Sequence, residues 1–276
     1  MREMKDAYTG VETWKMVEFD SLIDFYKYIM ETPRNNTFKY GELSSESRGI
    51  WSGTKTFEEA VTLFKNGWTV GAQDLVKKLK VAEANQEVQM KYRDILSMAG
   101  YQAIVPLYLQ GVPNCMVNKK PIAIKNKVIT INKALSVSSS VSSETLMNES
   151  IKCFQIIKKI EATGIRTNLN LMMSTGHVCV KIRLKSSNEK LNISKLAFPL
   201  VHTSMFRRLF FRFVEVYPTI PMSFRNGYGR VPYEYEFKNV CKKDEIILPT
   251  ILCGSSENEI EKLTVDDLLE RFKAKK

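Results

Sequence analysis

The stretch between residues 128 and 185 constrains the fold most, because it places a strand, a helix and two further strands in succession. The first strand runs apolar through Val128, Ile129 and Ile131, and residues 144–162 have the apolar spacing of an amphipathic helix. The first strand, the helix as a crossover and a second strand at 166–173 form a strand–helix–strand unit, whose two strands are expected to be parallel. The next strand follows after a hairpin-like turn and is expected to be antiparallel. The pattern predicts an α/β fold: a mixed, mostly parallel sheet with flanking helices.

The strand predicted at residues 177–185 alternates cleanly between apolar and polar positions. Its apolar side carries Val178, Val180, Ile182 and Leu184, and its other side carries Cys179, Lys181, Arg183 and Lys185. One face of this strand is therefore expected to pack on a core, while the other is polar and basic.

Residues before 101 read as helices rather than strands. Residues 19–30 form an amphipathic pattern that Asp20 or Ser21 could cap, and Thr56 with Glu59 makes a capping box before a helix that Gly67 ends. A long polar helix is predicted at 72–98. We therefore expect a helical N-terminal region over 1–100 and an α/β domain over 101–276. Further predicted elements of that domain are a strand-like run at 103–111, helices at 192–201 and 203–216, a strand at 244–252 and a terminal helix at 264–272.

The composition excludes several classes of protein. The 276-residue chain has no apolar run long enough to span a bilayer, and its charged N-terminus does not resemble a secretory signal. We therefore expect no membrane partner and a cytoplasmic location. The five cysteines are widely spaced, so we expect reduced, structural thiols and no zinc site. These are Cys115, Cys153, Cys179, Cys241 and Cys253.

Positive charge is concentrated in the middle of the chain. The net charge is +11, but residues 101–243 carry 22 basic and 7 acidic side chains, a net +15. Such a surplus suits a phosphate polymer, since lysine and arginine supply salt-dependent and largely sequence-independent affinity. It is also compatible with a well-solvated lysine-rich surface. The predicted nucleic-acid-binding residues are Lys181, Arg183 and Lys185 on one strand face, Arg207, Arg208 and Arg212 on one helix face, and Arg225 and Arg230 beside loop aromatics.

A serine-rich segment joins the strand at 128–135 to the helix that follows it. Ser136, Ser138 and Ser140 could hold an anion or a partner at the helix N-terminus. Alternatively, Ser142 or Ser143 caps the helix and the other serines are only loop. Both interpretations stay open.

The element order over about residues 101–255 resembles the von Willebrand factor A-like domain, in which a strand, a metal motif, a helix, a strand and an antiparallel neighbour follow one another. The metal motif of that family is Asp-x-Ser-x-Ser, and it would fall on Ser136, Ser138 and Ser140, with serine in place of the aspartate. Residues 101–188 contain no aspartate, and a hard divalent cation needs carboxylate oxygen. The resemblance therefore implies the fold without its metal.

A second resemblance covers the whole chain. The pattern WSGT-x-TFEEA-x-x-L-x-x-x-GW, from Trp51 to Trp68, is similar to an uncharacterised family of proteins that bacteriophages and mobile elements encode. Other stretches share the similarity: FDSLIDFYKYI, the LAFPL-VHTSMFRRLFFRFVE segment and NGYGRVP. The resemblance implies a phage or mobile-element setting, with a location in the cytoplasm of a bacterial host cell or in association with a virion, and it brings no activity with it.

Enzymatic chemistry finds little support in the residues. His177 and His202 are the only imidazoles, there is no G-x-S-x-G, and no phosphate-binding glycine fingerprint occurs. We therefore expect a non-enzymatic binding protein without cofactor, whose partner is DNA or RNA held on the basic face. The alternative is a protein-interaction or assembly module that contacts a phage or host protein, with the charge only solubilising. An enzyme would need a carboxylate or histidine cluster that only folding could assemble.

Overall fold

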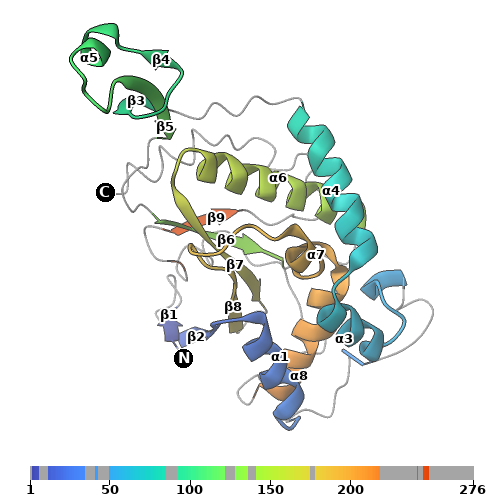
Figure 1. Cartoon of the computed structure of the whole chain (residues 1–276). Coiled ribbons are helices and arrows are strands. Elements are labelled where there is room, and N and C mark those ends of the chain that lie inside the picture. The colour runs from blue at the N-terminus through green and yellow to red at the C-terminus, as the bar shows by residue number, and fades with distance from the viewer. Residues whose placement is uncertain are drawn as a thin grey trace.

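The computed structural model describes residues 2–5, 12–34, 41–42, 50–84, 92–121, 128–135, 141–174, 178–217, 241 and 245–248. Figure 1 shows two parts: a large sheet with helices packed on it, which we call the body, and a small sheet apart from it, residues 92–121, which we call the arm.

The body contains a six-stranded sheet in the order β1-β2-β8-β7-β6-β9. Its strands are β1 (Arg2–Lys5), β2 (Glu12–Phe19), β6 (Val128–Ala134), β7 (Arg166–Ser174), β8 (Val178–Lys185) and β9 (Glu245–Leu248). The pairs β2–β8, β7–β6 and β6–β9 are parallel, and β1–β2 and β7–β8 are antiparallel. The predicted mixed, mostly parallel α/β sheet is confirmed, including the antiparallel β8.

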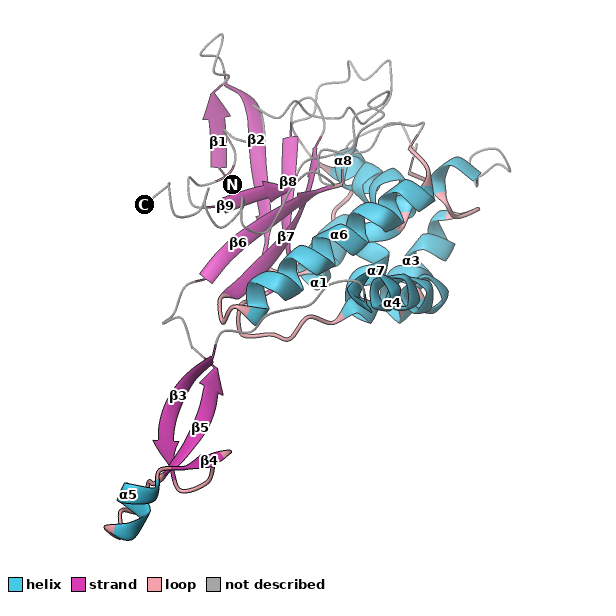
Figure 2. Cartoon of the chain, turned by 90° about the horizontal axis from the view of Figure 1, so that it is seen from above, coloured by secondary structure: helices cyan, strands magenta, loops and turns pink. Residues whose placement is uncertain are grey.

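Helices of the body that the structure describes lie on one side of the sheet (Figure 2). They are α1 (Leu22–Glu31), α3 (Phe57–Asn66), α4 (Thr69–Ala84), α6 (Ser143–Ala162), α7 (Ile193–Val201), the π-helix η1 (Met205–Phe210) and α8 (Phe211–Val216). The sheet therefore has a helix face, covered by these elements, and a second face that carries the polar positions of β6, β7 and β8.

Local sequence explains where these helices begin. Ser21, Thr56 and Ser142 each accept a hydrogen bond from the amide three residues later, as the N-cap residues of α1, α3 and α6. Glu59 completes a reciprocal contact by accepting from the Lys55 amide at 2.7 Å. The capping predictions for Ser21, Thr56 and Ser142 are confirmed. Gly67, at φ 83°, ends α3 as expected.

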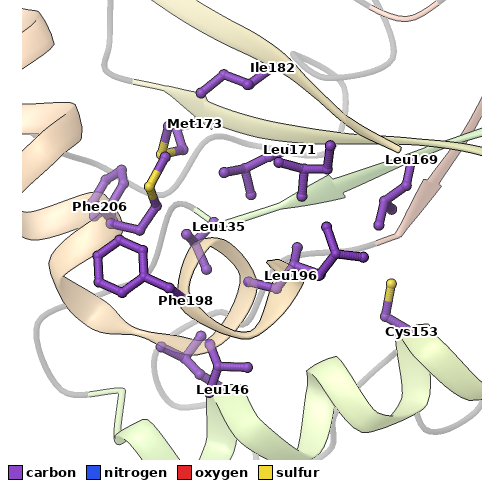
Figure 3. Close-up of a cluster of buried hydrophobic side chains, with 14 of the residues drawn as sticks. Leu135, Leu146, Cys153, Leu169, Leu171, Met173, Ile182, Leu196, Phe198 and Phe206 are labelled. Atoms are coloured by element: carbon purple, nitrogen blue, oxygen red, sulfur yellow. The ribbon is translucent and has the colours of Figure 1, made fainter. Parts of the chain in front are cut away.

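The core lies between the helix face and the helices. Leu135, Leu169, Leu171, Met173 and Ile182 from the sheet region meet side chains of α6, α7 and η1 (Figure 3). The helix side supplies Leu146, Cys153, Leu196, Phe198 and Phe206. Because β6 and β7 alternate with period two, the same strands turn Asn132, Asn168 and Asn170 to the second face.

The first hundred residues differ from their prediction. Strand β2 pairs with β8, Met16 opposite Cys179, so this region contributes a strand to the main sheet as well as helices. The helix predicted at 72–98 is α4, which ends at Ala84, and β3 (Tyr92–Ser97) follows after residues outside the described part. A boundary at residue 100 would therefore cut through the arm.

The arm is a three-stranded antiparallel sheet in the order β3-β5-β4, with β4 (Gln102–Ala103), α5 (Val105–Leu109) and β5 (Met116–Pro121). The strand-like run predicted at 103–111 is wrong over α5. Pro106, in the first turn, has the fixed φ that suits a helix start and no amide to satisfy there, so the apolar run begins a short helix.

No helix among the described residues combines the length and the apolar character that crossing a bilayer would require.

Candidate functional site

Each predicted cation of strand β8 is paired with an acid from another part of the chain. Lys185 is buried, and its Nζ donates to Glu161 Oε1 at 2.7 Å and to the Thr167 carbonyl at 2.9 Å. Arg183 is half-exposed, and its Nη2 lies 3.3 Å from Asp20 Oδ1. Lys185 therefore cannot reach a polymer of phosphates, while Arg183 can.

Lys181 belongs to a hydrogen-bonded network on the second face. Its Nζ donates to both carboxylate oxygens of Glu245, at 2.9 and 3.0 Å. Glu245 also accepts from Asn132 Nδ2 at 2.7 Å, and Asn132 Oδ1 accepts from Asn170 Nδ2 at 2.8 Å. All four residues are buried, so the Lys181 charge is satisfied within the protein.

The three arginines predicted on one helix face hold other segments of the body. Arg208 is only 1% exposed, and its guanidinium donates to the carbonyls of Gly41, Thr54 and Lys55 at 2.8 to 3.1 Å. Arg212 Nε donates to the Ile29 carbonyl at 3.1 Å. These side chains replace main-chain hydrogen bonds that irregular segments would otherwise lack.

Arg207 performs the same role beside the serine segment. Its guanidinium donates to the Trp51 carbonyl, lies 4.9 Å from the centre of the Trp51 ring, and reaches the Val141 carbonyl at 3.5 Å. Burial lowers the pKa of Arg207 to about 10, which still leaves the group charged at neutral pH. The predicted basic helix face is thus buried and does not form a surface.

Trp68, at the end of the Trp51–Trp68 pattern, packs against His202. The His202 ring stacks on Phe198 with centroids 5.1 Å apart and meets Trp68 edge-on at 4.8 Å. Its Nδ1 accepts from the Ser204 amide, and burial lowers its pKa to about 4, so the imidazole is neutral. Ser204 Oγ donates to the Ser52 carbonyl at 2.7 Å. Ser52 and Ser204 are both buried, which favours a structural role for their hydroxyls over a catalytic one.

Several predicted site residues lie outside the described part of the chain. They are Ser136, Ser138 and Ser140, Arg225 and Arg230, and His177.

In the part of the chain that the structure describes, neither the cysteines nor the side chains that could bind a metal form a reactive cluster. Cys115, Cys153, Cys179 and Cys241 are free thiols, and burial raises the pKa of Cys153 and of Cys241 to about 12. A thiol with so high a pKa is a poor nucleophile at neutral pH. Across the described ranges, no three His, Cys, Asp or Glu side chains are grouped to hold a metal ion.

A polar cavity opens on the second face, at the amino ends of β6 and β7. Its volume is about 430 Å³, within the range of small-molecule sites. Lys181 and Glu245 contribute to its lining, and Arg183 and Asp20 lie where β8 and β2 end. The complete lining is Glu18, Phe19, Asp20, Thr130, Asn168, Asn170, Lys181, Arg183, Ser186, Ser187 and Glu245.

The arm carries most of the large apolar side chains that the described surface exposes. Seven of twelve lie on it, although it is a small part of the protein, so they form a concentration rather than a scatter. They are Leu96, Met98, Tyr101, Val105, Tyr108, Leu109 and Val112. Met98 and Leu109 are each more than 70% exposed. Such a concentration of exposed apolar side chains on one small element is unusual for a protein surface.

Sequence reasoning missed the arm, yet a signal was present. Residues 95–118 contain no Asp, Glu, Lys or Arg in a chain in which 26% of residues are charged. A run of that length without charge is expected in a core or at an interface, and the structure places it at the surface. The cavity had no comparable signal, because its lining comes from five strands that are far apart in sequence.

Comparison with known proteins gives a family and nothing finer. No curated protein and no solved structure matches the chain. Residues 9–276 match a family described as a domain of unknown function, DUF7192. Since this match spans nearly all of the sequence, the chain belongs to the DUF7192 family.

Proposed function

We propose that this protein is a protein-binding module whose arm, residues 92–121, inserts its apolar tip into a partner protein. The observation that carries the proposal is the set of exposed apolar side chains on the arm, above all Tyr108 and Leu109 of α5. An exposed tyrosine on a projecting element is a typical anchor. The exposed leucine beside it adds apolar area that leaves water when the tip enters a pocket.

The arm's own packing supports the idea that a partner covers it. Among the arm side chains whose burial is described, residues 94–119, only Cys115 is buried. None of the arm residues belongs to the two hydrophobic clusters of the body. Small antiparallel sheets with so little core are marginal in water. Contact with a partner would supply the missing burial.

Charge indicates the chemistry of that partner. Strands β3 and β5 carry Arg93, Lys119 and Lys120 against the single acid Asp94 at the end of the arm nearest the body. Asp94 already accepts from the Tyr101 hydroxyl at 3.1 Å. We therefore propose an apolar groove with an acidic rim on a different protein. A second copy of this chain is disfavoured, because two molecules of charge +11 repel each other.

Nucleic acid is the competing class of partner, since the arm combines Tyr101 and Tyr108 with Lys119, whose Nζ lies 5.4 Å from the Tyr101 ring centre. Aromatic stacking with nearby cations suits single strands. Aliphatic Leu96, Met98, Val105 and Leu109 have no such use and suit a protein groove. The observations favour the protein partner.

The setting and the finer fold are part of the same proposal. The order β6, serine segment, α6, parallel β7 and antiparallel β8 is the order expected of a von Willebrand factor A-like domain, and it supports that assignment. The phage or mobile-element setting rests on the Trp51–Trp68 pattern. An assembly role within a phage is consistent with an arm that inserts into a neighbouring protein.

Site-specific photo-crosslinking in cells tests the proposal. A photoreactive residue replaces Tyr108 in one variant and Val70, which is equally exposed on α4 of the body, in a matched control. We expect one discrete heterologous protein adduct from position 108 that position 70 does not give. The adduct's protein, once purified, should bind the wild type and lose at least about tenfold in affinity for a Tyr108→Asp, Leu109→Asp variant.

Other outcomes would overturn the proposal. Adducts only with this chain would indicate self-association, and adducts with nucleic acid or lipid would replace the protein partner by those classes. The same adducts from both positions would mean that the arm has no specific partner. The thermal unfolding of the Asp variant should match that of the wild type, since neither residue is buried in the body.

A further inference from the structure

We infer that the polar cavity on the second face is a binding site for a small zwitterion of the α-amino acid class. The cavity lies at the amino ends of β6 and β7, opposite the carboxyl ends where open α/β sheets usually place ligands. Its lining includes no residue of the arm, so it is a site separate from the arm.

The base of the cavity is an unusually polar piece of sheet. Glu245, Lys181, Asn132 and Asn170 form a continuous hydrogen-bonded chain with distances of 2.7 to 3.0 Å. Burying an ion pair contributes little net stability, and aliphatic residues of similar size would hold the sheet as well. The network is better explained as a rigid, fully satisfied floor that fixes the positions of Lys181 and Glu245.

The rim carries charges that a ligand can reach. Asp20 and Glu18 are well exposed, and Arg183 is half-exposed. An exposed pair such as Asp20–Arg183 contributes only about 0–1 kcal/mol, so exchange of its partners is inexpensive. Both groups are thus available, Arg183 as a forked donor to a carboxylate and Asp20 as an acceptor from an ammonium.

The charge balance selects the class of ligand. The lining holds the acids Glu18, Asp20 and Glu245 and the cations Lys181 and Arg183, a net −1. That balance disfavours polyphosphates. A molecule with one carboxylate and one ammonium on the same carbon matches the Asp20–Arg183 pair, whose charged atoms are 3.3 Å apart. Each end of the zwitterion then faces the group of opposite charge.

Neutral groups define where the rest of the ligand lies. Asn168 links Thr130 to Ser187 in the cavity lining. Its Nδ2 donates to Thr130 Oγ1 at 3.3 Å, and its Oδ1 accepts from the Ser187 amide at 2.7 Å. With the Ser186 and Ser187 hydroxyls, these residues form a polar wall. A polar side chain on the amino acid suits this wall, and a large aliphatic one does not.

Calorimetric titration of the full chain tests the inference. The probes are serine, asparagine, glutamine, aspartate, glutamate, arginine and lysine, each as the free L-amino acid. The best binder is then compared with its N-acetyl form, which lacks the ammonium, and its amide, which lacks the free carboxylate. We expect saturable binding of at least one free amino acid and a loss of about tenfold or more for each blocked form.

Substitutions at the rim locate the binding. Arg183→Gln and Asp20→Asn should each weaken binding by about tenfold or more, and Arg183→Lys should weaken it less because it keeps the charge. Arg166→Gln, an exposed arginine of β7 outside the cavity, is the matched control and should change nothing. Exposed positions allow these changes without unfolding, which circular dichroism verifies.

Three results would overturn the inference. These are no binding by any of the seven amino acids, equal binding of the blocked and free forms, or binding that Arg183→Gln and Asp20→Asn leave unchanged. Glucose and inorganic phosphate serve as comparison probes, and preferential binding of either would assign the cavity to that class. None of these results depends on the arm, so failure of this inference would not bear on the protein partner proposed for the arm.

Discussion

Gly53 occupies a position in the body that leaves no room for a side chain. Its φ is 82°, and a Cβ there would lie 2.4 Å from Thr203 Oγ1 and 3.1 Å from the His202 ring. The backbone conformation and the neighbouring side chains both require the absence of a side chain. The glycine of the WSGT segment is thus explained by the close approach of this segment to the residues after α7.

Gly53→Ala is therefore expected to destabilise the protein by about 2–4 kcal/mol, from backbone strain together with displacement of Thr203. Gly67→Ala is the control, since Gly67 has φ 83° but no atom within 4 Å of the added Cβ. It should lose only the strain, about 1 kcal/mol. Urea unfolding of both variants measures the difference, and equal losses would show that the contact with Thr203 is unimportant.

His202 makes stability depend on pH. Burial lowers its pKa from 6.5 to about 4, against a smaller raising effect of Glu59, so the unfolded chain binds the proton more readily than the folded one. The contribution of neutral His202 to the free energy of unfolding is fully present above pH 6.5. It decreases by about 3 kcal/mol as the pH falls toward 4.

Unfolding free energies of wild type and His202→Gln between pH 4 and 7 check this expectation. The wild type should lose stability more steeply over that interval. Parallel curves for the two proteins would mean that His202 titrates normally.

Strand β6 and helix α6 are joined by a buried ion pair. Lys133 Nζ lies 2.5 Å from Glu149 Oε2, and both side chains are almost inaccessible. Removal of one partner leaves the other charge in the core. Lys133→Met alone should therefore cost about 3–5 kcal/mol, whereas Lys133→Met with Glu149→Leu should recover most of the loss. Thermal unfolding of the single and double variants compares the two, and an equally unstable double variant would contradict the reason given.

Elements with strong local signals were predictable and others were not. Helices α1, α3 and α6 have N-cap residues and a one-sided apolar pattern, and β8 alternates along its whole length. Strand β3 lacks such a signal, because it exists only through pairing with β5. The burial of the η1 arginines was also not predictable. In the sequence they look like an exposed basic stripe, and only the fold brings the carbonyls of Gly41 and Thr54 beside them.

Charge is distributed differently in the folded molecule than along the chain. Residues 101–243 have a surplus of cations, but Lys181 and Arg183 are paired with Glu245 and Asp20, which lie outside that stretch. Counting charges along a sequence cannot detect partners that only the fold brings together. The same reason explains why the sequence drew attention to Lys181 and Arg183 but not to the acids beside them.

The triple substitution Arg207→Ala, Arg208→Ala, Arg212→Ala is consequently expected to unfold the body rather than to weaken binding. Each guanidinium satisfies buried carbonyls, so its removal leaves them without hydrogen bonds at about 1–3 kcal/mol each. The triple variant should unfold well below the wild type or fail to accumulate. A stable triple variant with a reduced salt dependence of DNA binding would restore the basic-face hypothesis.

The two edge strands of the main sheet, β1 and β9, lie far apart in the sequence. Strand β1 pairs with β2 near the start, and β2 pairs with β8, while β9 is near the end and pairs with β6. During synthesis at about 5–20 residues per second, β2 leaves the ribosome roughly 8–30 seconds before β8 exists to receive it. The nascent chain must therefore keep β2 from pairing elsewhere during that interval, and assembly of the body cannot finish before β9 emerges.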